Sequence, residues 1–281
     1  MTMVSTHSTP ADRIFSPDSL FWQINREGLM VLSGPRALLL ELAHPLVAQG
    51  VVDHSNFRAR PLGRLFRTVG VMTALNFEPH AQAGAAVKHT RVCHARVRGT
   101  LPQDVGPYLA GTPYRGDDPL LQLWVLATLL DSVLAAYAHL VRPLTEAEKQ
   151  AYYAVGQRLG RAFGIPAELM PPTYEDFECY VAAMVDSDAL TVGPAARDVV
   201  QALFAPLPLG PAIRLSSFIS LGLTPPRLRA AFGLPWTDAH ERRFQQLGAL
   251  SRRLRPLTPD PLCVHPQALL AEWRLRRASP N

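Results

Sequence analysis

Five of the nine histidines in this chain of 281 residues lie within residues 34–99. They are His44, His54, His80, His89 and His94. The stretch begins with one of the most apolar segments of the sequence, GPRALLLELAHPLVAQGVV. A polar side chain on such a segment is costly to bury unless it has a partner. Because a neutral imidazole is a common metal ligand, we interpret this stretch as a cofactor site and take haem as the working hypothesis.

His94 is the sharpest candidate for a ligand. We expect residues 79–98 to form a helix, on which His94 points towards the core. The residues on its face are Ala83, Val87, Thr90 and Val97. A histidine on an apolar face is more often a core residue with a satisfied hydrogen bond. A haem site, however, needs an imidazole from a helix inside an apolar pocket, and His94 meets that description.

Arg64, Arg67 and Thr68 have the spacing of one helical stripe, i, i+3 and i+4, on a helix expected over residues 62–77. The simpler interpretation is a solvated face. The functional interpretation is a polar stripe facing the cofactor. Its guanidinium groups would bind the haem propionates, or donate hydrogen bonds towards dioxygen.

Glu41 and His44 form a Glu-x-x-His pair, which in ferritin-like bundles supplies two ligands of a di-iron centre. Such a centre needs a second pair, and the sequence has none. A non-haem iron site using Glu41 and His44 therefore stays an alternative, and His44 stays a candidate cofactor-binding residue. Pro45 after His44, and Asp53 beside His54, also suggest that these histidines fix a transition from helix to loop.

Helical periodicity dominates the rest of the chain, and no alternating β pattern is convincing, so we predict an all-α fold. One large domain is expected over residues 17–255, after a flexible leader at 1–16 and before a tail with a short helix at 256–281. Gly156, Gly160 and Gly164 have the spacing of a close helix–helix contact. Residues 100–118 are expected to be a loop. Besides the helices already named, we expect helices over residues 17–28, from 36 to a break near Pro45, and over 119–141, 145–164, 173–184, 195–204, 225–232, 238–254 and 267–277.

The composition is that of a globular protein, with 48% apolar and 18% charged residues. The three cysteines are widely spaced and form no CxxC motif, and no secretory signal begins the sequence, so a cytoplasmic protein is expected. Residues 119–141 are long enough to span a bilayer. Because Gln122, Asp131 and His139 interrupt them, we favour a buried core helix over a membrane span.

Arginine supplies nearly all of the positive charge, since Lys88 and Lys149 are the only lysines. Many arginines lie in the last quarter of the chain, but no nucleic-acid-binding motif accompanies them. We interpret them as solvated surface and expect no nucleic acid partner. Peripheral contact with a membrane is left open, as is the oligomeric state.

Several segments in combination resemble the catalytic domain of MpaB-type oxygenases and rubber oxygenases (latex clearing protein). They are RALLLELAHPLVAQGVVDHSNF, PLGRLFRT, the His-Ala-x-Val-Arg-Gly of residues 94–99, DPLLQLWVLATLLDS, the Leu-Thr-x-x-Glu-x-x-x-Tyr of residues 144–152 and the segment 172–180. The resemblance covers roughly residues 20–255.

The resemblance implies a globin-like helical core that holds one haem b, with His94 as the axial iron ligand. The family's Arg-x-x-Lys-Thr segment reads Arg64-Leu-Phe-Arg67-Thr68 here, with arginine in place of lysine. Leu126 stands where many relatives have histidine. The implied activity is that of an oxygenase that uses dioxygen on a small apolar, isoprenoid-like substrate, with Arg64 and Thr68 as catalytic residues. The alternative is a helical domain that binds an apolar ligand without turnover.

Overall fold

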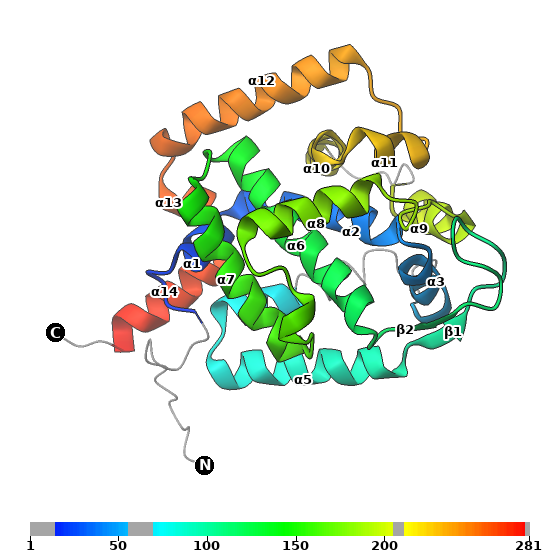
Figure 1. Ribbon diagram of the computed structural model, residues 1–281. Coiled ribbons are helices and arrows are strands. Elements are labelled where there is room, and N and C mark those ends of the chain that lie inside the picture. The colour runs from blue at the N-terminus through cyan, green and yellow to red at the C-terminus, as the bar shows by residue number, and fades with distance from the viewer. Residues whose placement is uncertain (1–14, 56–69, 205–210, 279–281) are drawn as a thin grey trace.

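Helix α6 (Pro119–Leu140) runs through the middle of a bundle of helices (Figure 1). The computed structural model describes residues 15–55, 70–204 and 211–278. Asp118 caps α6 by accepting the backbone N–H groups of Leu120 and Leu121, and Pro119 occupies the first turn. A helix that is apolar on all sides must be surrounded by other elements. Here α2, α7, α8 and α12 contact α6, and the prediction of an all-α protein is confirmed.

The other described helices surround α6 or extend the chain on either side of it in sequence. They are α1 (Leu20–Asn25), η2 (Gly28–Leu32), α2 (Ser33–Leu42), α3 (Pro45–His54), a helical segment at residues 70–77, α5 (His80–Arg96), α7 (Glu146–Phe163), η3 (Ala167–Leu169), α8 (Tyr174–Asp186), α9 (Pro194–Phe204), α10 (Pro211–Leu223), α11 (Pro226–Ala231), α12 (Asp238–Leu254), η4 (Arg255–Leu257), α13 (Asp260–Cys263) and α14 (Pro266–Ala278). Figure 1 shows α5 and α12 on opposite edges of the bundle.

An ion pair between buried Arg36 and half-buried Asp131 fixes α6 against α2. The Arg36 guanidinium lies 2.7 Å from the Asp131 carboxylate and also donates to the Ser132 hydroxyl and to the Leu223 carbonyl, each at 2.7 Å. The pair therefore links α2, α6 and the end of α10. Among the described helices, α6 is the one long and apolar enough to cross a membrane. Of its most apolar stretch of 18 residues, 56% is buried inside the fold.

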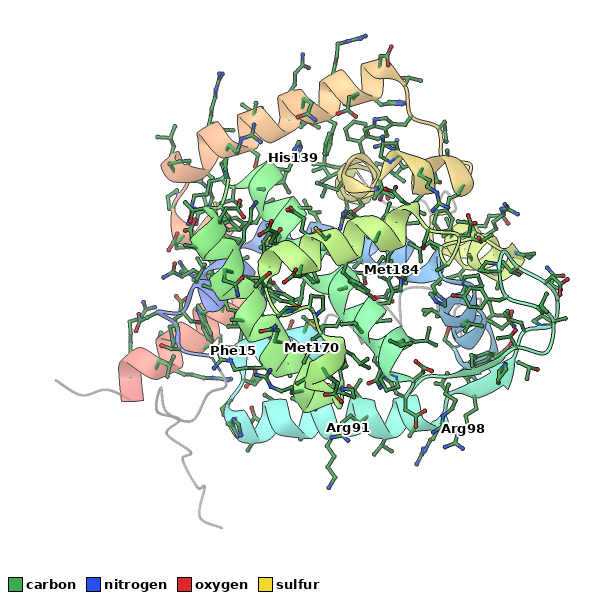
Figure 2. The ribbon with its side chains drawn as sticks, viewed as in Figure 1. Phe15, Arg91, Arg98, His139, Met170 and Met184 are labelled. Carbon is green, nitrogen blue, oxygen red and sulfur yellow. The ribbon has the colours of Figure 1, made fainter. Side chains whose placement is uncertain are left out.

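Several predicted boundaries are confirmed, because local caps determine them. The break near Pro45 separates α2 from α3, with His44 as the N-cap and Pro45 in the first turn. Thr145 begins α7 through a capping box with Glu148, and Thr237 begins α12. At its far end α6 meets α12, where the His139 ring stacks on Phe244 at 3.8 Å between centroids (Figure 2).

Other boundaries differ from the prediction. The helix expected over residues 17–28 is the short α1, because Glu27 leaves the helical conformation to bridge Val264 and pair with Arg255. The apolar helix α10 follows a proline-rich segment that was not predicted to lead into a helix. Helix α14 contacts α1, where the Trp22 indole N–H donates to Glu272.

A two-stranded antiparallel sheet was not predicted. Strands β1 (Arg98–Thr100) and β2 (Pro113–Arg115) pair so that Gly99 lies opposite Tyr114. As a result α5 ends at Arg96 instead of Arg98, and part of the expected loop at 100–118 is a strand. A side chain at position 99 would overlap the Tyr114 ring, so the glycine permits this close pairing rather than ending the helix.

Two of the three spaced glycines make the predicted close contact. A Cβ atom added at Gly156 would overlap Leu130 of α6, and one at Gly160 would overlap Leu126. Gly164 has a different role, because it ends α7 with a φ of 99°. The helices α6 and α7 can therefore approach closely along the first two glycines.

We expect Gly156→Ala to lower the free energy of unfolding by about 1–3 kcal/mol, because the new methyl group overpacks the contact with the buried Leu130. The matched control is Gly84→Ala on α5, where a Cβ atom has open space. That change should raise stability by about 0.5–1 kcal/mol through helix propensity. Urea denaturation of both variants measures the difference. Stabilisation by both substitutions would contradict the close contact.

Candidate functional site

A cavity of about 370 Å³, here called the main cavity, lies among α3, α5, α6 and α7. Its volume is within the range of small-molecule and cofactor sites. The walls are mostly apolar. The polar side chains on them are those of Glu41, His89, Thr90, Cys93, His94, Tyr114, Arg115, Gln122 and Tyr152. An apolar chamber with a few polar groups can bind an apolar ligand or a largely apolar cofactor.

His94 lies on this wall, half-buried, in the last turn of α5. The helical face anticipated from the sequence is the one that turns inwards. Ala83 and Val87 are buried on it, and Thr90 and Val97 are half-buried. Arg98, just beyond the helix, is exposed at the edge of the molecule (Figure 2). The periodicity of α5 thus brings an imidazole to the main cavity.

The small sheet holds the end of α5 that carries His94. The His94 carbonyl accepts the N–H group of Val97 at 3.0 Å, and the Val97 carbonyl accepts the N–H group of Gly116 at 2.9 Å. A Cβ atom at Gly116 would lie 2.8 Å from the His94 carbonyl oxygen. The β2 end and the His94 backbone therefore touch, and the sheet fixes where this imidazole is presented.

Helix α6 forms the apolar wall of the main cavity. The contributing side chains are Leu121, Val125, Leu126, Leu129, Leu130 and Val133. Leu126 occupies the position at which the resemblance noted above implies histidine in many relatives. It also packs against Gly160 of α7. These six side chains offer no metal ligand.

Glu41 is buried, with 6% of its surface exposed, and it lines the main cavity from α2. It also lines a smaller cavity of about 120 Å³, here called the side cavity. Glu41 is therefore a wall residue of both cavities.

His44 does not line the main cavity. Its Nδ1 atom accepts the backbone N–H group of Leu46 at 3.3 Å, and its Nε2 atom lies 3.1 Å from the Tyr108 hydroxyl. Burial lowers the pKa of His44 to about 4, so the ring is neutral. Both ring nitrogens are engaged and His44 caps α3, whereas its cofactor-binding role stays a prediction.

The di-iron interpretation gains no further ligands. Across residues 15–55, 70–204 and 211–278, no group of three or more His, Cys, Asp or Glu side chains is placed to hold a metal ion. Asp53 and His54 do not pair with each other either. Asp53 accepts a short hydrogen bond from the Tyr114 hydroxyl, and His54 Nε2 lies 2.9 Å from the Arg98 carbonyl oxygen.

Tyr108 and Tyr114 are site residues that the sequence analysis missed. Tyr108 supports His44, and Tyr114 lines the main cavity while donating to Asp53. Burial, and then the hydrogen bond to Asp53, raise the pKa of Tyr114. Both tyrosines lie in a stretch rich in Gly and Pro. An aromatic residue in such a stretch was the one feature of the sequence that could have identified them.

Arg64, Arg67 and Thr68, the predicted polar stripe, lie outside the described residues.

Fold and site together define a helical domain whose histidine-bearing helix lines an internal apolar cavity. The chain belongs to the family described as ER-bound oxygenase mpaB/B′/Rubber oxygenase, catalytic domain, whose sequence profile matches residues 22–253. It is also similar to two mycobacterial relatives, each 30% identical over 233 residues, which cover 79% of this chain and 87% of the relative. They are "Uncharacterized protein Mb2261" of Mycobacterium bovis and "Uncharacterized protein Rv2237" of Mycobacterium tuberculosis. No solved structure matches the chain.

The lowered pKa of His44 predicts a pH dependence of stability. Because the folded pKa of about 4 lies below the ordinary value of 6.5, the unfolded chain binds the proton more readily. His44 therefore leaves stability intact above pH 6.5 and reduces it as the pH falls towards 4, by about 3 kcal/mol at most. In His44→Asn, which keeps an N-cap side chain, this loss should be absent.

Chemical denaturation at matched pH values between 7 and 4 gives the free energy of unfolding of wild type and His44→Asn. The difference between the two proteins isolates the effect of His44, because the contributions of other titrating groups cancel. Parallel profiles would contradict a buried neutral His44.

Proposed function

We propose that this protein is a haem b-dependent oxygenase that acts with dioxygen on a small apolar substrate, with His94 as the axial ligand of the iron. Membership of the family supports an oxygenase-type oxidoreductase. The observation that supports haem and His94 as its ligand is the position of His94, half-buried on a helix that lines the apolar main cavity.

The residues around the main cavity suit haem b. An imidazole from a helix is the common proximal ligand of haem iron, and apolar walls keep water away from it. His94 supplies the imidazole and α6 supplies the apolar wall. Bound there, haem b would supply the chemistry that activates dioxygen. Arg64 and Arg67 are proposed to bind the propionates, which a guanidinium group does well.

The chain's own residues have three tasks in this proposal. The β1–β2 sheet holds the end of α5 and with it the backbone at His94. Leu121, Val125 and Leu129 exclude water and offer a surface for an apolar substrate. Arg64 and Thr68 are proposed to orient dioxygen and substrate by donating hydrogen bonds, as catalytic residues. The rubber oxygenases named in the family description support an unsaturated, isoprenoid-like substrate.

The protein purified from cells supplied with iron and a haem precursor should be red, with a Soret band. His94→Ala should lose the band, because the axial ligand is gone. His89→Ala is the matched control, since it removes another imidazole of α5 that lines the same cavity but should leave the band in place. Absorption spectra and a pyridine haemochrome assay on all three proteins measure the haem content.

Two other outcomes would support the alternatives. A colourless, folded protein that ignores added haem and binds apolar ligands would favour a non-catalytic binding domain. Bound iron without a porphyrin spectrum would favour a non-haem site that uses Glu41 and His44. Unchanged haem content in His94→Ala would overturn the role of His94 while leaving haem binding in place.

A further inference from the structure

The side cavity lies beside the main cavity and reaches towards the surface. The two share four wall residues, Glu41, Met72, Leu129 and Val133. The side cavity is further lined by Val31, which is 52% exposed, so its wall reaches the surface at η2. A ligand longer than the main cavity could therefore extend past Met72 and Leu129 into the side cavity.

Several polar side chains of the side cavity form hydrogen bonds within the protein. The Asn25 amide donates to the Phe21 carbonyl and lies 3.4 Å from the Tyr152 hydroxyl. The Glu27 carboxylate is held by Arg255 through two hydrogen bonds of 2.7 Å. These groups are satisfied and do not require a ligand.

Asn76 differs from them. It is buried, with 6% of its surface exposed, and it lines the side cavity from the helical segment at residues 70–77. Within the part of the chain that the structure describes, its Oδ1 atom has no hydrogen-bond donor. An unsatisfied buried carbonyl of this kind costs about 1–3 kcal/mol. A side-chain amide presents both an acceptor and donors, so a hydroxyl group can complement it in either orientation.

His265 adds a second polar group on the same wall. Its Nδ1 atom accepts the backbone N–H group of Gln267 at 3.2 Å, and burial lowers its pKa. The neutral ring that accepts at Nδ1 carries its proton at Nε2, where it is a donor. Asn76 and His265 are thus both wall residues of the side cavity, one with an amide and one with a neutral imidazole.

We propose that the side cavity binds the hydroxyl end of a ligand whose apolar chain lies in the main cavity, and that Asn76 accepts the hydroxyl proton. The chemistry of this ligand as a substrate rests on the proposed function, whereas its binding does not. The substrate class is then a long-chain or isoprenoid alcohol rather than a pure hydrocarbon.

Charge argues for a neutral end group. Among the described residues that line the side cavity there is no lysine or arginine, so a carboxylate or phosphate would be buried there without a cation to pair with. An ammonium group has three protons to donate, and Asn76 offers it a single free acceptor. A hydroxyl needs one acceptor and one donor, which Asn76 and His265 supply.

The test compares 1-dodecanol with dodecyl methyl ether, which has the same chain but no proton to donate, and with dodecylamine. Isothermal titration calorimetry of the full-length protein as purified gives each dissociation constant. Wild type should bind the alcohol roughly tenfold more tightly than the ether, the effect of one buried hydrogen bond. Asn76→Leu, of similar shape, should bind alcohol and ether alike. The control Met72→Leu changes the shared wall without a polar atom and should keep the preference.

Equal affinity of wild type for alcohol and ether would overturn the proposal, and would mean that Asn76 is satisfied by water alone. A preference that persists in Asn76→Leu would overturn the role of Asn76. Tighter binding of dodecylamine would identify a cation site instead. If Asn76→Leu does not fold, Asn76→Ala, which also lacks the acceptor, and the wild-type comparison decide the question. Haem content is measured on the same samples. Absence of haem, which would contradict the proposed function, and absence of the alcohol preference therefore appear as separate results.

Discussion

Burial of the long apolar helix α6 is the constraint on which the rest of the structure depends. Its carboxylate at Asp131 lies within the bundle and needs a partner, because an uncompensated charge there would be strongly destabilising. Arg36 supplies that partner and fixes α2 beside α6. Since α3 follows α2 after the break at Pro45, its residues are brought to the cavity that α6 lines. The interaction that stabilises the core therefore also shapes the site.

Elements with local signals could be predicted from the sequence. Helices α7 and α12 begin at capping residues that can be read directly, and α6 is apolar along its whole length. The β1–β2 pair could not be predicted, because each strand has three residues and is stabilised by its partner across a long loop. Gly99 directly follows the helix expected over residues 79–98, and its role is to make room for the Tyr114 ring. Such a contact leaves no local pattern.

The same distinction holds for the site. Helical periodicity was enough to place His94 on the inner face of α5. The role of His44 depends on Tyr108, which is 64 residues away in the sequence. The free acceptor of Asn76 is also invisible in the sequence, because it follows from which donors are missing around it. The cavities themselves exist where several helices meet, so neither could be derived from any one segment.

The central claim is that His94 holds the iron of haem b in the main cavity. The most direct measurement is the anomalous scattering of iron in crystals of the protein purified with its own cofactor. An iron peak beside the His94 imidazole, at the centre of porphyrin density in the main cavity, is the expected result. Iron beside Glu41 without porphyrin density, or a main cavity that holds an apolar ligand and no iron, would contradict the claim.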